Sequence, residues 1–127
     1  MRFLLSIWFM LFTALAVFAQ DNIAIQDLLK EAESKLYVNP QETGKITDYI
    51  LSQKESTLVN AEALLLLSKS FYTRGNYNQA IKNALEARKI AEDSKDISIK
   101  VKTSFFVIQL LRELDLETVA ENYSNVL

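Results

Sequence analysis

The chain has 127 residues, of which 14 are Lys or Arg and 16 are Asp or Glu, so its net charge at pH 7 is −2. This length has room for one small domain, and the slightly acidic balance argues against a surface that binds nucleic acid. The sequence contains no Cys and no His, which excludes disulfides and thiolate chemistry and removes the commonest general base and metal ligand. We therefore expect a protein that is not an enzyme and that has no catalytic residue, no cofactor and no metal site.

Residues 1–19 have the layout of a secretory signal peptide. Arg2 gives a positive start, residues 3–18 are almost entirely apolar, and residues 17–19 are small or compact. We interpret residues 1–19 as a signal peptide helix and expect a periplasmic or secreted protein. The alternative is an uncleaved anchor in the inner membrane, although a spanning helix needs about 20 apolar residues. The chain would then contact the membrane only through this N-terminal segment.

Residues 22–56 are predicted to form two helices. Asp21 or Asn22 can cap the first helix, and the residue before Pro40 is pushed away from the helical region, so the first helix must end there. Pro40 suits the first turn of the second helix, whereas Gly44 weakens its interior. The expected apolar positions are Ile25, Leu28, Leu29, Ala32 and Leu36 in the first helix and Ile46, Tyr49 and Ile50 in the second.

Residues 60–93 show the clearest pattern. Apolar and small residues recur at intervals of three and four, which places them on one helical face, until residues 73–76 interrupt the pattern. Gly75 can take the left-handed conformation that ends a helix, and Asn76 can cap the next helix, with Gln79 able to reach back to the Asn76 backbone N–H. We predict a tight antiparallel hairpin with Leu64, Leu67, Ser68 and Phe71 facing Tyr77, Ala80, Ile81, Ala84, Ala87 and Ala91.

These residues resemble a tetratricopeptide (TPR) repeat, a motif of about 34 residues that forms two helices. With Ala61 as the first motif position, the signature positions hold Leu64, Leu67, Ser68, Phe71, Gly75, Tyr77, Ala80, Ala84 and Ala87. The chain departs from the pattern at Leu64, where the family often has Trp, and at Glu92, where many members have Pro. The resemblance implies stacked hairpins with a concave groove that receives an extended peptide or a partner helix. The alternative is a generic helical hairpin in a bundle.

Residues 96–127 are predicted to be a partial third repeat. Asp96 or Ser98 can start a helix through Val101, Phe105, Ile108 and Leu111, and because residues 105–111 are nearly all apolar we expect it to be buried on more than one side. A buried β-strand is the alternative. Residues 112–115 would be the next turn, followed by a sixth helix lined by Leu116, Val119, Ala120, Tyr123 and Leu127. That helix would leave an apolar edge uncovered.

The predicted fold class is therefore all-α. Residues 20–127 would form a short TPR-like α-solenoid of about three repeats, at approximately residues 22–56, 60–93 and 96–127, with the last repeat incomplete. We expect an exported, non-catalytic scaffold that binds a protein or peptide and serves as the sensory or assembly module of a larger protein. The arrangement resembles the start of bacterial sensory regulators with exported repeats. The alternative is a structural helical protein that forms a homo-oligomer through its open C-terminal edge.

The resemblance also implies which residues face the groove. The groove-facing motif positions of the clear repeat hold Glu62, Leu65, Lys69, Tyr72 and Thr73. Lys69 could hold a carboxylate, Tyr72 could stack or form a hydrogen bond, and Leu65 could fill an apolar contact. The alternative is that these five side chains simply face water.

Overall fold

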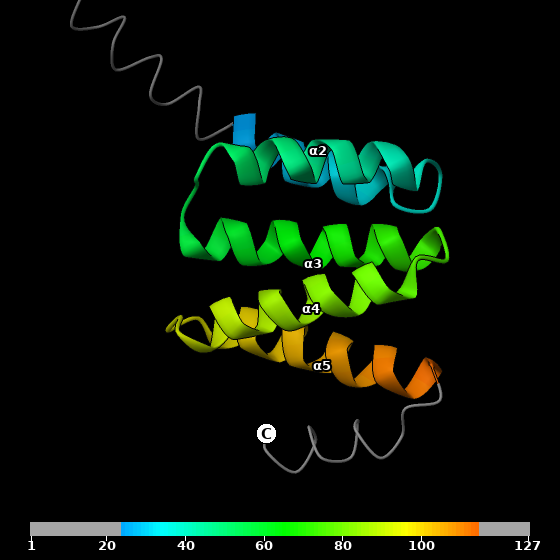
Figure 1. The fold of residues 1–127 in the computed structure, drawn as a ribbon. Helices are drawn as coiled ribbons and strands as arrows, with labels where there is room; N and C mark the ends of the chain where they lie inside the picture. Colours follow the sequence, from blue (N-terminus) through cyan, green and yellow to red (C-terminus); the bar gives the residue numbers. More distant parts are fainter. Residues whose placement is uncertain (1–23, 115–127) are drawn as a thin grey trace, which may run out of the picture.

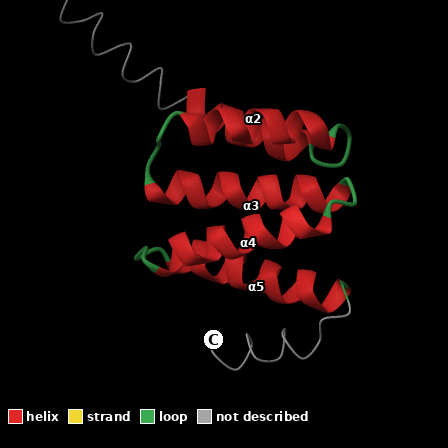
Figure 2. Cartoon of the chain, viewed as in Figure 1, coloured by secondary structure: helices red, strands yellow, loops and turns green. Residues whose placement is uncertain are grey.

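A computed structural model describes residues 24–114, all of which lie in helices or in the turns between them (Figure 2). No β-strand occurs within this range, so the all-α prediction is confirmed for it and the alternative of a strand at residues 105–111 is wrong. The predicted signal peptide at residues 1–19 and the predicted helix at residues 116–127 lie outside the described residues.

The described helices run side by side and are joined by short turns (Figure 1). The first occupies residues 24–35, and it is followed by α2 (Pro40–Ser52), α3 (Thr57–Thr73), α4 (Tyr77–Glu92) and α5 (Ile97–Glu113). Helix α3 packs against α2 and α4, α4 packs against α5, and α3 also touches α5. The first helix buries Leu29 and Ala32, as predicted, and Leu36 is buried in the turn that follows it.

Each helix from α2 to α5 begins at a polar side chain that accepts a hydrogen bond from the backbone N–H three residues later. The four caps are Asn39, Ser56, Asn76 and Asp96. Such caps satisfy N–H groups that have no partner within the helix. Pro40 stands in the first turn of α2, as expected. Helix α3 begins at Thr57, before the predicted start at residue 60, because the Ser56 hydroxyl caps it.

The turn between α3 and α4 ends one helix and starts the next within three residues. Gly75 has a φ of 81°, the left-handed conformation predicted for it. The Asn76 N–H donates to the Phe71 carbonyl at 2.8 Å, and the Gly75 N–H donates to the Tyr72 carbonyl at 3.0 Å. These two bonds form a Schellman motif. The motif uses the Asn76 N–H, so the predicted reach of Gln79 back to that group is wrong.

Helix α4 carries an alanine stripe, defined as Ala80, Ala84, Ala87 and Ala91, and each of these residues is at most 1% exposed. Ala80 and Ala84 pack with Val107, Leu110 and Leu111 of α5, and Ala87 and Ala91 pack with residues of α3. The hydroxyl of Ser68 donates to the Ala80 carbonyl at 2.5 Å, which joins α3 to α4. Leu64 packs with Ala87. Tyr77 was expected in this interface, but it is 47% exposed at its edge.

Helices α2 and α3 come close together around Gly44. A Cβ atom at Gly44 would lie 3.2 Å from the Arg74 side chain and 3.4 Å from the Ser70 hydroxyl. That hydroxyl donates to the Pro40 carbonyl at 2.5 Å. The glycine that weakened the prediction of α2 is therefore the residue that lets α3 approach.

The predicted apolar face of α2 is partly wrong. Ile50 is fully buried, but Tyr49 is 54% exposed. Thr43 and Thr47 are buried instead, with the Thr43 hydroxyl donating to the Ala32 carbonyl of the first helix at 2.7 Å. The Thr47 hydroxyl donates to the Thr43 carbonyl, so neither buried hydroxyl lacks a partner.

The predicted buried face of α5 is also partly wrong. Leu111 is buried, but Val101 and Phe105 are 61% and 68% exposed. The face that packs against the rest of the described chain holds Ile99, Thr103, Val107 and Leu110. Arg112 and Glu113, expected in a turn, still belong to the helix. Burial of α5 on more than one side is thus not seen among residues 24–114.

We expect Ala84→Leu to lower the free energy of unfolding by about 1–3 kcal/mol, because three extra carbons cannot enter the packed contact between α4 and α5 without displacing it. Ala24→Leu, at an exposed position of the first helix, is the matched control and should change it by less than about 0.5 kcal/mol. Urea unfolding followed by circular dichroism measures both. Equal midpoints for the two variants would contradict the packing described for the alanine stripe.

Candidate functional site

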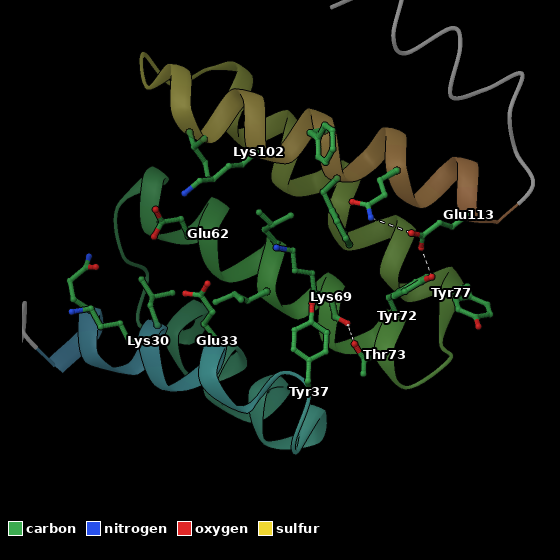
Figure 3. A pocket seen from close by; sticks show the side chains of 18 residues that line it. Lys30, Glu33, Tyr37, Glu62, Lys69, Tyr72, Thr73, Tyr77, Lys102 and Glu113 are labelled. Carbon is green, nitrogen blue, oxygen red and sulfur yellow. Dashed lines mark hydrogen bonds between the residues drawn. The ribbon is translucent and has the colours of Figure 1, made fainter.

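A groove with a volume of about 880 Å³ crosses the first helix, α3 and α5 (Figure 3). Helix α3 forms its floor, the first helix and the turn after it form one wall, and α5 forms the other. Helix α2 contributes no lining residue, and α4 contributes only Tyr77 at its start. The lining residues are Gln26, Leu29, Lys30, Glu33, Tyr37, Glu62, Leu65, Leu66, Lys69, Tyr72, Thr73, Tyr77, Ile99, Lys102, Phe105, Phe106, Gln109 and Glu113.

All five residues that the sequence placed in a groove lie along its floor. In Figure 3, Glu62 lies toward one end, Lys69 near the middle, and Tyr72 and Thr73 toward the other end. Leu65 is only 7% exposed and packs with Leu64 and Ala87. Leu65 therefore offers a ligand little surface, and the polar atoms of the floor come from the other four.

The walls contain residues that the sequence analysis did not single out. Lys30, Glu33 and Tyr37 come from the first helix and its turn, and Lys102 and Glu113 come from α5. Groove-facing positions were assigned only for the clear repeat at residues 60–93, so none was named in these two helices. The signal that could have found them is the alternation of the helices, since every second helix, namely residues 24–35, α3 and α5, lines this groove.

One end of the groove holds charges of both signs. Lys30, Glu33, Glu62 and Lys102 line it from three different helices (Figure 3). Burial raises the pKa of Glu62 above its ordinary value, Lys102 opposes this rise, and Asp96 and Glu33 add to it. The folded protein therefore stabilises the charged form of Glu62 less than water does.

The other end is aromatic and joins α3 to α5. The Tyr72 hydroxyl donates to the Glu113 carboxylate, and Gln109 donates to the other oxygen of that carboxylate at 3.2 Å. The hydrogen bond to Glu113 raises the pKa of Tyr72. The ring centroid of Tyr77 lies 5.6 Å from that of Tyr72. Between the two ends, the Lys69 ammonium lies 5.5 Å from the centre of the Phe106 ring, within the range of a cation–π contact.

The groove is lined by polar and charged groups as well as by aromatic rings. Its side chains supply amides, hydroxyls, ammonium groups and carboxylates that can form hydrogen bonds and ion pairs with a bound chain. Within residues 24–114, no three carboxylates are grouped so that they could hold a metal ion. No helix in the same range is both long and apolar enough to cross a membrane.

Comparison with protein-family models, with curated proteins and with solved structures found no match to this chain. The functional interpretation of the groove therefore depends on its geometry and on the sequence pattern.

We expect Glu62→Gln to raise the thermal unfolding midpoint at pH 7. The pKa of Glu62 is higher in the folded protein than in the unfolded chain, so the wild type loses stability as pH rises from the ordinary glutamate pKa through the folded pKa. Gln carries no charge and avoids this loss. Below the ordinary glutamate pKa, the side chain at position 62 is neutral in the wild type as well as in the variant, so the difference between their two unfolding midpoints should vanish. Calorimetry across pH 3 to 8 measures it, and a variant less stable than wild type at pH 7 would contradict the pKa direction.

Proposed function

We propose that this protein is an exported, non-catalytic TPR-like scaffold that binds an extended peptide or a partner helix in the groove of α3. One observation carries the proposal: the groove is lined by every second helix, namely residues 24–35, α3 and α5, and hardly at all by α2 and α4. A solenoid of helical hairpins presents its first helices on one face in this way, and such faces are extended binding surfaces.

The charges of the groove favour a peptide over a nucleic acid. Its three lysines, Lys30, Lys69 and Lys102, are matched by three glutamates, Glu33, Glu62 and Glu113. A phosphate backbone needs a surplus of positive charge, which this lining does not provide. A peptide carries backbone donors and acceptors as well as side chains of either sign, so the amides of Gln26 and Gln109 and the hydroxyl of Thr73 suit it.

The lining also gives the bound peptide a direction. A basic side chain near Glu62 would add to the attraction that Lys102 already gives this half-buried carboxylate. An acidic side chain near Lys69 would give that ammonium a charged partner beside the Phe106 ring. The favoured ligand thus presents a basic group toward the Glu62 end and an acidic group toward the middle of the floor.

The proposed place of action is outside the cytoplasm. Residues 1–19 carry the layout of a signal peptide, and a cysteine-free helical stack needs no disulfide in that compartment. There the scaffold would act as a sensory or assembly module through the protein bound in its groove.

A photo-reactive amino acid at Thr73, which is exposed at the groove, should capture the partner in cells that make the protein. With the captured partner purified, Lys69→Glu combined with Tyr72→Ala should raise the dissociation constant at least tenfold, which is a loss of about 1.4 kcal/mol of binding free energy. Isothermal titration calorimetry measures the change.

The matched control is Lys82→Glu combined with Tyr49→Ala, a charge reversal and an aromatic truncation at exposed positions of α4 and α2 outside the groove. This variant should bind like the wild type. Unchanged binding by the groove variant, or an equal loss in both double variants, would remove the groove assignment.

A further inference from the structure

An apolar stripe runs along the side of α5 that is not packed against α4. This α5 stripe consists of Ile97, Val101 and Phe105, which are 75%, 61% and 68% exposed, and of Ile108, which is half-buried because it also packs against the contact between α4 and α5. The spacings of four, four and three residues keep these side chains on one face of the helix. A shallow groove of about 370 Å³ follows the stripe, and it is lined by Glu92, Lys100, Val101, Ser104, Phe105 and Ile108.

This stripe differs from ordinary surface hydrophobicity. Single exposed apolar residues are normal on soluble proteins, but four in line on one helix form a patch that usually marks a contact surface. The opposite face of α5 is covered, because Val107, Leu110 and Leu111 pack on the alanine stripe of α4. The α5 stripe is therefore the free side of the last described helix.

The chain itself supplies a segment of matching length that begins beside this stripe. Leu114 ends α5, donates its N–H to the Leu110 carbonyl at 3.1 Å and packs against the core. Residues 116–127 have apolar side chains at helical spacing, Leu116, Val119, Ala120, Tyr123 and Leu127. Twelve residues in a helix extend about 18 Å, and the thirteen steps from Val101 to Leu114 extend about 20 Å.

We propose that the α5 stripe is the docking surface for residues 116–127 of the same chain, which lie against it as an antiparallel amphipathic helix. This arrangement does not depend on what binds in the groove of α3. A short turn after Leu114 pairs residues in opposite directions along the two helices, so position 123 faces Phe105 and position 127 faces Val101. The segment covers Val101, Phe105 and Ile108, and Ile97 lies beyond its end.

Because the chain has no native Cys, paired cysteines test the docking directly in the full-length protein. Phe105→Cys with Tyr123→Cys, purified in mild detergent and treated with a mild oxidant, should form a disulfide within one chain. Trypsin cuts after Lys102 and Arg112, and no Lys or Arg follows Arg112. Mass spectrometry should therefore find peptide 103–112 joined to peptide 113–127.

The matched control is Phe105→Cys with Glu121→Cys. Position 121 is only two residues from position 123 but lies on the polar side of the docked helix, so its disulfide should form at least ten times more slowly. A second pair, Val101→Cys with Leu127→Cys, keeps Phe105 in place and should also join within one chain.

Two results would overturn the proposal. Equal rates at positions 121 and 123 would show that the segment has no fixed face toward α5. Disulfide-linked dimers of the single variant Phe105→Cys, in place of the bond within one chain, would show that a second copy covers the stripe.

Discussion

The close approach of α4 to both α3 and α5 is the constraint on which the rest of the described structure depends. Ala80, Ala84, Ala87 and Ala91 recur at intervals of four, three and four residues, and all are buried. Side chains this small let two helices approach α4 on adjoining sides, with large residues such as Leu64 and Val107 filling the space from their own side. Ser68 adds a hydrogen bond to the α4 backbone at the point of contact.

This packing also places the groove. Because the side chains of α4 are small where it meets its neighbours, α3 and α5 touch each other, and their side chains meet across the groove. The link from Tyr72 to Glu113 and the contact of Lys69 with Phe106 both join α3 to α5. Side chains held in this way lose less conformational freedom when a ligand binds, which favours affinity. The helix contacts that form the core thus also position the groove.

The sequence predicted the parts of the fold that local chemistry controls, and it was wrong where packing between elements decides. Pro40, Gly75 and the alanine stripe each act through backbone geometry or size, so their roles could be read from the residues alone. Thr43 and Thr47 were missed because a buried threonine satisfies its hydroxyl on a nearby carbonyl, which no count of apolar residues detects. Val101 and Phe105 were assigned inward because α5 is apolar on several sides. The five residues of α3 that were named from the sequence line the groove, whereas no groove-facing positions were assigned on the other two helices.

Helix α5 connects the two surfaces of the molecule. Phe105 lines both the groove of α3 and the shallow groove along the α5 stripe, and Phe106, next to it, lies beneath Lys69. Whatever covers the stripe must therefore also restrict the wall of the groove, since the two share a side chain and a rigid helix. A helix that is packed on a further side cannot shift without opening a void, so a segment on the stripe would hold α5 more firmly than α4 and α3 do alone. Covering the α5 stripe and fixing the wall of the groove are therefore coupled through Phe105.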